Sequence, residues 1–144
     1  MSSGKYEYLS QKVLNFIFNN STFTQPGTLG LALFTVAPTI STTGTEVTNA
    51  GAYARVSVSV GTSNTNWAVI SGSTTTVTSQ VAFTFTPATA TWSAGSNITD
   101  AGFFDSTSYG AGNLYYWGDV TVAKPVFNGD TASFPANAVT VQEL

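Results

Sequence analysis

Cysteine and histidine are both absent from this sequence of 144 residues. Without cysteine there is no disulfide framework, no Cys-ligated zinc, no iron–sulfur cluster and no thiol catalysis. Without histidine the commonest general base and the commonest transition-metal ligand are missing. These absences exclude several large enzyme classes, and we expect no catalytic residue, no metal and no cofactor.

Charged residues are also scarce. Lys and Arg number 4 and Asp and Glu number 7, so 8% of the chain is charged, against about 25% in an average soluble protein. Four basic residues and a net charge of −3 cannot neutralise a nucleic-acid backbone, so no nucleic-acid partner is expected. Soluble monomers normally carry a denser coat of charge. We infer that other subunits cover much of this surface.

Long hydrophobic runs are missing as well. No window approaches 18 consecutive apolar residues, which argues against a membrane-spanning segment. The apolar cluster Leu14-Asn15-Phe16-Ile17-Phe18 is too short for the core of a signal peptide, so we expect neither export by the usual route nor membrane insertion. The chain is nevertheless 42% hydrophobic and 13% aromatic, which favours one folded domain spanning residues 1–144.

One segment has helical periodicity. Tyr6, Leu9, Val13 and Phe16 recur at spacings of three and four within residues 4–19, which predicts a short α-helix with these side chains on one face. Two interpretations are open: the face packs on its own domain, or it docks on a neighbouring subunit, since chain termini are convenient attachment points. The four residues are therefore candidate interface residues.

From residue 28 to residue 142 the periodicity is that of β-strands. Leu29, Leu31 and Leu33 alternate with small residues, which predicts a half-buried strand. Several such segments, separated by turn residues and without a βαβ rhythm, predict an all-β domain: an antiparallel β-sandwich or jelly-roll-like fold. The segment 74–85 is either one continuous strand or a hairpin. The expected strands cover residues 28–35, 53–60, 74–85, 98–104, 114–122, 131–134 and 138–141.

Carboxylates are the remaining candidates for catalysis or metal binding. Asp100 and Asp105 flank residues 101–104, and Asp119 and Asp130 follow. Paired carboxylates can cleave a glycosidic bond, and calcium accepts oxygen ligands from loops. However, Asp105 precedes a Ser/Thr/Gly loop and Asp130 closes an Asn-Gly turn, where such residues usually bond the local backbone. We expect turn capping, with a calcium site at Asp100 or Asp105 and a glycanase as the alternatives.

Aromatic side chains and one arginine are the better candidates for recognition. Tyr115 and Trp117 share one face of an expected strand, and Tyr109 lies in the loop before it. Core packing is the default for such rings, with sugar stacking or burial at a subunit interface as alternatives. Tyr109, Tyr115 and Trp117 are thus candidate glycan-stacking residues. Arg55 is a candidate interface residue, because its guanidinium can hold a carboxylate of the same chain or of a neighbour.

Short ordered motifs run along nearly the whole chain, from about residue 9 to residue 141. They are FTQP at 23–26, LGLALFTVAPT at 29–39, GTEV at 44–47, GAYAR at 51–55, FTPATATW at 85–92, AGFFD at 101–105, GNLYYWG at 112–118, KP at 124–125, NGDT at 128–131 and FPANAVT at 134–140. This ordered set resembles a family of small virion structural proteins of tailed bacteriophages.

The resemblance implies a component of the virion with no catalytic residues to carry over. Members of this group carry labels such as tail fibre or minor tail protein, and related small β-sandwich proteins form trimeric cement on the capsids of short-tailed phages, including cyanophages. It implies a homotrimer on the outer surface of the virion, made in the host cytoplasm. Its partners would be other copies of itself and the major capsid protein or tail proteins of the same phage.

The residue pattern favours one role within that group. A fibre shaft would show a long repeat or heptads for trimerisation, and neither occurs in this sequence. We therefore expect a non-catalytic capsid decoration protein that stabilises the shell. The alternative is a tail fibre or tail-associated adhesion module that contacts host surface glycans through Tyr109, Tyr115 or Trp117.

Overall fold

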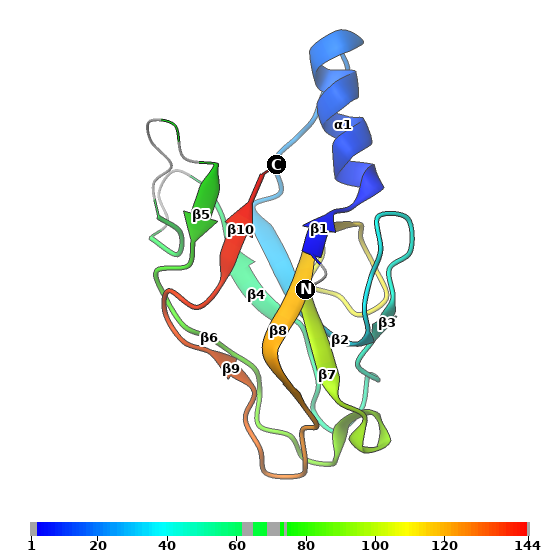
Figure 1. Cartoon of the computed structure of the whole chain (residues 1–144), viewed down its shortest axis with the longest axis vertical. Coiled ribbons are helices and arrows are strands. Elements are labelled where there is room, and N and C mark those ends of the chain that lie inside the picture. Colours follow the sequence, from blue (N-terminus) through cyan, green and yellow to red (C-terminus); the bar gives the residue numbers. More distant parts are fainter. Residues whose placement is uncertain (1–2, 62–64, 69–72, 74, 144) are drawn as a thin grey trace.

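The computed structural model describes residues 3–61, 65–68, 73 and 75–143. The chain is mainly β with antiparallel pairing, and one α-helix rises from one end of the β-structure (Figure 1). In chain order the elements are β1 (Ser3–Lys5), α1 (Glu7–Phe18), β2 (Thr28–Val36), β3 (Thr45–Glu46), β4 (Val56–Ser59), β5 (Thr76–Thr78), β6 (Phe83–Thr84), the 3-10 turn η1 (Trp92–Gly95), β7 (Ile98–Phe104), β8 (Leu114–Lys124), β9 (Ser133–Phe134) and β10 (Thr140–Gln142).

The larger sheet is built around β2. Its strand order is β1-β8-β7-β2-β3, and β4 also pairs with β2. Leu31 and Leu33 face one side of the sheet and Phe34 faces the other, and all three are at most 2% exposed. The prediction that this strand is half-buried was wrong, because a second apolar cluster packs Phe34 against Leu114 and Trp117 on the opposite face.

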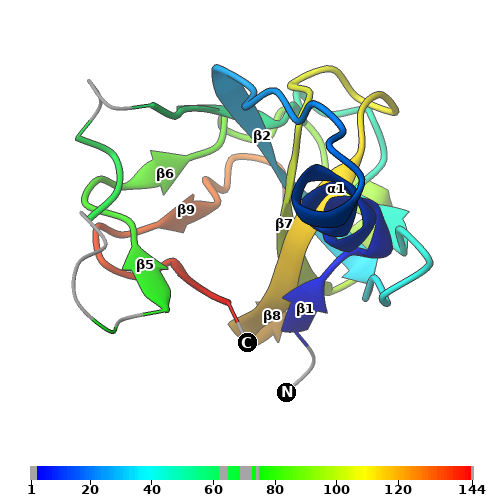
Figure 2. The ribbon, with the colours of Figure 1, turned by 90° about the horizontal axis from the view of Figure 1, so that it is seen from above.

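A second layer covers the face that carries Leu31 and Leu33. It consists of two short antiparallel pairs, β5 with β10 and β6 with β9, which lie across from the large sheet in the view from above (Figure 2). The core between the layers includes Tyr53, Phe85 and Trp92, whose ring centroids lie 5.2–6.3 Å apart. This arrangement confirms the predicted all-β fold with antiparallel sheets and one α-helix.

The helix begins later than the sequence predicts. Residues 4 and 5, at the start of the expected helical segment 4–19, belong to β1, which pairs with β8, and α1 starts only at Glu7. Tyr6 is extended, with φ −71° and ψ 147°, and its N–H donates to the Tyr115 carbonyl at 2.8 Å. Pairing with β8 satisfies backbone groups that the helix would otherwise use, and Gly4 has low helix propensity.

The predicted strand 74–85, whose first residue lies outside the described residues, forms neither one strand nor a hairpin over residues 75–85. Its two ends belong to different pairs, because β5 bonds with β10 and β6 bonds with β9. Buried Ser79 lies between them, where its N–H donates to the Val139 carbonyl at 2.8 Å and its hydroxyl accepts from the Val139 N–H at 3.2 Å. These bonds hold the chain where it passes from one pair to the next.

Candidate assembly and recognition surfaces

Helix α1 is attached to the domain through its first turns only. Leu9 is 6% exposed, and Tyr6 packs against the cluster that contains Trp117. Val13 is half-buried, and beyond it the helix rises above the sheets (Figure 1). Two of the four predicted interface residues, Tyr6 and Leu9, thus attach α1 to its own domain. The exposed large side chains that follow are Leu14, Phe16, Ile17 and Phe18, at 56%, 59%, 60% and 76% exposure.

Aromatic contacts reinforce the base of α1. The Tyr8 ring stacks on Tyr115 with centroids 6.1 Å apart, and Phe23 lies 6.3 Å from the same ring. Burial, together with the charge of Asp105 and the neighbouring Tyr8, raises the pKa of Tyr115 to about 12. Tyr115 and Trp117, two of the three candidate glycan-stacking residues, are only 7% and 8% exposed, so their rings offer little surface to a sugar.

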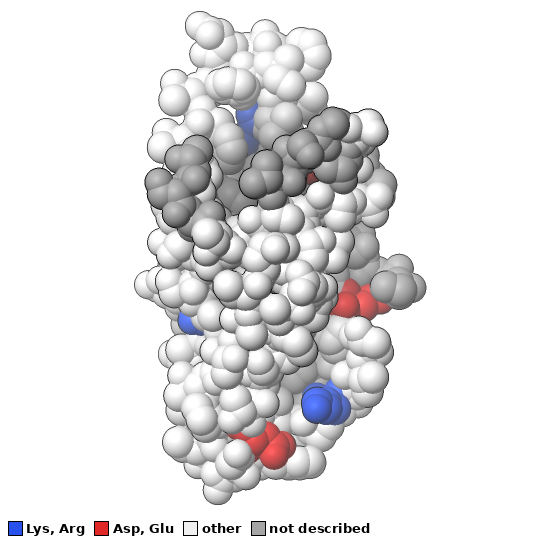
Figure 3. Space-filling model, turned by 90° about the vertical axis from the view of Figure 1, so that its left-hand side faces the viewer, with Lys and Arg blue, Asp and Glu red and all other residues white. Residues whose placement is uncertain are grey.

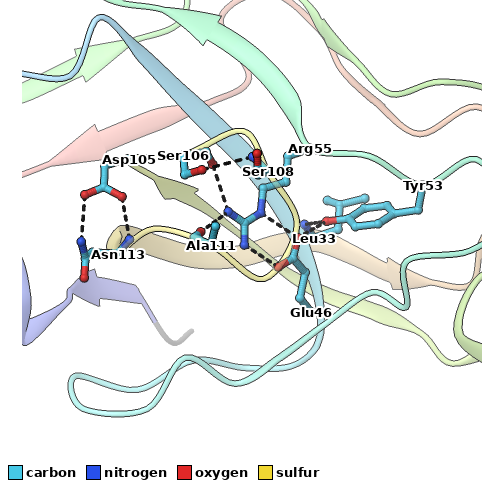
Figure 4. Close-up of polar contacts among 9 residues, drawn as sticks. All are labelled: Leu33, Glu46, Tyr53, Arg55, Asp105, Ser106, Ser108, Ala111 and Asn113. Atoms are coloured by element: carbon cyan, nitrogen blue, oxygen red, sulfur yellow. Dashed lines mark hydrogen bonds and ion pairs between the residues drawn. The ribbon is translucent and has the colours of Figure 1, made fainter.

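Arg55 lies just before β4 and points into the molecule (Figure 4). Its guanidinium pairs bidentately with Glu46 of β3, with Nε donating to Oε1 at 2.9 Å and Nη2 donating to Oε2 at 2.7 Å. The two side chains are 1% and 11% exposed, and the guanidinium carbon lies 3.7 Å from the centre of the Phe104 ring. Arg55 therefore holds a carboxylate of its own chain, the first of the two alternatives that the sequence left open.

The third guanidinium nitrogen of Arg55 fixes the loop 105–113. Nη1 donates to the carbonyl oxygens of Ser106 at 3.0 Å and Ala111 at 2.8 Å, so one buried cation holds both sides of the loop (Figure 4). The loop crosses β2 so closely that a Cβ on Gly30 would lie 2.3 Å from the Ser106 carbonyl oxygen. Only glycine fits at this crossing.

Asp105 closes the base of the same loop. Its Oδ1 accepts the Asn113 backbone N–H at 2.6 Å, and its Oδ2 accepts the Asn113 side-chain amide at 3.0 Å (Figure 4). Gly112 has a φ of +80°, and a Cβ there would lie 2.5 Å from Asp105 Oδ1. Asp105 therefore caps the loop, as its sequence context predicts.

Tyr109 lies toward the tip of this loop and is 43% exposed. Its ring meets the Tyr53 ring edge-on, with centroids 6.3 Å apart. The Tyr53 hydroxyl donates to Glu46 Oε1 at 2.9 Å and accepts the Leu33 N–H at 3.0 Å. Burial, followed by the charge of Glu46, raises the pKa of Tyr53 far above its usual range, so the hydroxyl stays protonated. Tyr109 thus rests on a ring fixed by the carboxylate that also holds Arg55.

The carboxylates considered as catalysts or calcium ligands do not come together in a single site. Asp100 and Asp119 are opposite one another on β7 and β8, and Asp100 is 2% exposed. Burial, with a smaller contribution from Asp119, raises the pKa of Asp100. Asp130 accepts a backbone N–H at 2.9 Å and closes its turn. Within the described ranges, no group of three or more His, Cys, Asp or Glu side chains is placed to hold a metal ion.

A groove of about 860 Å³ lies between the second half of β8 and the β9–β10 segment. At one end of it Glu143 accepts the Tyr116 hydroxyl at 2.5 Å and forms an ion pair with Lys5. Burial acts to raise the pKa of Glu143, but the bonds from Lys5 and Tyr116 outweigh it, and the pKa is lowered. These contacts tie the last strand to β1 and β8.

The outer surface is mostly uncharged. Figure 3 shows one face, on which the charged residues lie apart from one another among uncharged ones. In the part of the chain that the structure describes, no helix combines the length and the hydropathy needed to cross a bilayer.

Glu46, Leu14 and Phe18 are important residues to which sequence reasoning assigned no role. Glu46 is one of only 7 acidic residues and lies nine positions before Arg55, one of only 4 basic ones. In so charge-poor a chain, pairing each base with its nearest acid would have found this ion pair. Leu14 and Phe18 fall outside the stripe formed by Tyr6, Leu9, Val13 and Phe16, which Ile17 widens, and no pattern marks them as exposed.

Comparison with known families gives a match over most of the chain. A family model described as "Podophage GP4 fiber I protein gp80" matches residues 4–142. No curated protein matches the chain.

Proposed function

The chain belongs to the podophage GP4 fiber I protein gp80 family, and on this premise we propose that it is a non-catalytic subunit of a fibre on the outer surface of a phage particle. Family membership makes the chain a phage structural protein. The proposal adds the fibre assembly, the outer surface and a passive mechanism in which each copy contributes contacts and no chemistry.

The observation that carries the proposal is the shape of the molecule. A β-sandwich bears, at one end, a helix that exposes four large apolar side chains in its last turns (Figure 1). Exposed apolar patches bordered by polar residues usually mark interaction surfaces. Such a division suits a fibre subunit, in which the helix end joins the assembly and the sandwich is displayed.

Capsid decoration is the second candidate, and a different observation favours it. The chain is compact and carries only 11 charged residues in total, which suits a protein repeated in many copies against a shell. Its partner would then be the major capsid protein, and it would strengthen the shell through the summed energy of many contacts. In the fibre the partners would be tail or other attachment proteins of the same phage.

Contact with host surface glycans is a further part of the proposal. Tyr109 is exposed on a loop held by the buried Arg55 fork and by Asp105, so its ring is displayed with little freedom. An aromatic ring fixed in advance loses little entropy when it stacks on a sugar. Tyr109 is the residue that we assign to such stacking.

Copy number and position on purified particles test the proposal. We expect few copies, confined to discrete fibre attachment points, by quantitative mass spectrometry and by electron microscopy with a labelled chain. Hundreds of copies spread over the head would contradict the fibre role and favour capsid decoration. A purified particle that contains no copy of the chain would refute both.

Glycan contact has its own test. Binding of the purified chain to host cells is compared for Tyr109→Ala and for Phe127→Ala, which removes an aromatic ring that is 53% exposed in a different turn. We expect Tyr109→Ala to lower binding about fivefold or more, because stacking on one ring contributes on the order of 1 kcal/mol or more. Equal binding by both variants would remove Tyr109 from the proposal.

A further inference from the structure

We infer that the exposed end of α1, residues 13–18, is the surface through which copies of this chain associate, in a closed ring in which each helix contacts two neighbours. The inference deepens the proposed function, and it rests on that proposal in taking the protein as a repeated subunit. Three properties of the helix end carry it: its lack of charge, the width of its apolar face and its exposed area.

The helix end carries no charge. The charged residues of α1 are Glu7 and Lys12, and both precede residue 13. Identical copies that meet through an uncharged surface do not repel one another, whatever the symmetry of the contact. The same lack of charge gives a nucleic acid or an oppositely charged protein nothing to bind.

The apolar face is too wide for a single flat contact. At about 100° per residue, Val13, Leu14, Phe16, Ile17 and Phe18 spread over roughly 200° of the helix circumference. A helix packed against one surface typically shows an apolar stripe of about 100°, whereas one that is apolar over much of its circumference is surrounded. The width therefore favours contact with more than one neighbour, as in a ring of three or more copies.

The exposed area is large enough to contribute substantially to a contact with each neighbour. With about 200 Å² for one large apolar side chain, the exposed fractions of 56–76% for Leu14, Phe16, Ile17 and Phe18 amount to about 500 Å². A standard interface buries about 800 Å² on each partner. Divided between two neighbours, the helix end supplies about 250 Å², roughly a third of this, to each contact. Ile40 adds to it, because it is 67% exposed and its carbonyl accepts the Glu7 N–H at 2.9 Å at the base of α1.

A lipid surface fits the helix less well than a second copy does. Helices that lie on membranes carry Lys and Arg on the polar face to meet anionic lipids. The polar arc of α1 consists of Gln11, Lys12 and Asn15, with Asn19 just beyond the helix, and so has one basic residue. We therefore infer that a second copy of the chain is the partner that covers this surface.

The decisive experiment compares two matched substitutions in the full chain. Phe18→Ser removes the most exposed ring of α1, and Phe127→Ser removes a ring that is 53% exposed in a turn at another site. Mass is measured by light scattering over a dilution series from about 1 mM to about 1 μM. We expect a multiple of the 15.0 kDa chain mass for the unaltered protein and for Phe127→Ser, and at least a tenfold weaker association for Phe18→Ser.

Introduced cysteines test whether the helices face one another. Because the chain has no cysteine, Ile17→Cys places a single thiol on the helix end, and Val122→Cys places one at a side chain on β8 that is 69% exposed. A disulfide requires Cα atoms within about 7 Å. We expect disulfide-linked dimers from Ile17→Cys under mild oxidation, and none from Val122→Cys.

Three results would overturn the inference. The first is an unaltered chain that stays at 15.0 kDa throughout the series, including the case in which α1 binds another phage protein or vesicles instead. The second is a Phe18→Ser variant that associates as the unaltered chain does. The third is crosslinking through Val122→Cys and not Ile17→Cys. None of these results bears on copy number or position in the particle, so a failure here is distinguishable from a failure of the proposed fibre role.

Discussion

Loop 105–113 and helix α1 both extend outward from the sandwich, but they are held in opposite ways. The loop has no regular structure of its own, and a buried arginine, a capping aspartate and two close glycine contacts fix it. The helix is regular, and only its first turns pack on the domain. The loop is complete within one chain, whereas the helix presents apolar surface that the chain itself leaves uncovered.

The difference shows what each segment contributes. Fixing a loop with buried polar groups costs desolvation energy, which the chain recovers only if every partner is in place. That arrangement gives a single conformation, as recognition requires. An apolar helix end needs no such arrangement, because the hydrophobic effect is not directional and operates once a neighbour arrives. The loop therefore suits display, and the helix suits assembly.

The largest expected effect comes from breaking the network under the loop. Arg55→Met leaves Glu46 buried without its cation and the carbonyls of Ser106 and Ala111 without their donor. We expect the free energy of unfolding to fall by about 3–5 kcal/mol, the usual cost of removing one partner of a buried ion pair. Urea denaturation of the purified variant measures the change.

Lys124→Met is the matched control for Arg55→Met, because Lys124 is an exposed cation on β8. Its effect should stay within about 0.5 kcal/mol. If Arg55→Met loses less than about 1 kcal/mol, the loop is held by something other than the buried arginine.

The second effect compares two leucines of the same helix. Leu9 is 6% exposed and Leu14 is 56% exposed. We expect Leu9→Ala to cost about 2–3 kcal/mol, because it leaves a cavity at the base of α1, and Leu14→Ala to cost less than about 1 kcal/mol. Denaturation at a chain concentration low enough to dissociate any assembly measures both. Equal costs would show that the far end of α1 packs on its own domain after all.

Much of the sandwich could be predicted from the sequence, because strand alternation is a local signal. The strands β2, β7 and β8 lie close to their expected ranges of 28–35, 98–104 and 114–122. The strands β1 and β3 were missed, because each is only two or three residues long and is defined by its pairing, β1 with the distant β8 and β3 with β2. The split of the segment 74–85 likewise depends on bonds between Ser79 and Val139, sixty residues away.

The candidate surfaces were less predictable, because exposure depends on the whole fold. Tyr6, Leu9, Val13 and Phe16 do recur with helical spacing, but the spacing does not reveal that the domain ends beside Val13. Arg55 lies at a position that strand alternation assigns to the outer face, yet it is buried, because β4 starts only at Val56. The local pattern also could not predict exposure of the aromatic rings, of which Tyr109 is exposed and Tyr115 and Trp117 are buried.

A third prediction separates backbone strain from close packing within the loop. Gly110 and Gly112 have φ values of +71° and +80°, but a Cβ meets nothing within 4 Å at Gly110 and lies 2.5 Å from Asp105 Oδ1 at Gly112. We expect Gly110→Ala to cost about 1 kcal/mol and Gly112→Ala to cost about 1–2 kcal/mol more, by urea denaturation. Hydrogen exchange at the Asn113 amide, which Asp105 accepts, should speed up only in Gly112→Ala. Equal costs would mean that the Asp105 cap moves aside freely.

The smallest effect concerns the ion pair at the α1 end of the molecule. Glu143 bonds Lys5 and Tyr116, and its carboxylate has a lowered pKa despite partial burial. A carboxylate whose pKa is lower in the folded chain stabilises the fold above its unfolded value of about 4.3, and this stabilisation is lost as the pH falls through the folded value.

Since the Glu143 side chain is 47% exposed, we expect the contribution to be below about 1 kcal/mol and to weaken in high salt. It is measured as the loss in unfolding free energy between pH 7 and pH 3 in the unaltered chain minus the loss in Glu143→Gln. The buried pair of Arg55 and Glu46 should respond much less to salt, because little solvent reaches it. Equal salt sensitivity of the two pairs would contradict the distinction between an ion pair enclosed beneath the loop and one open to solvent.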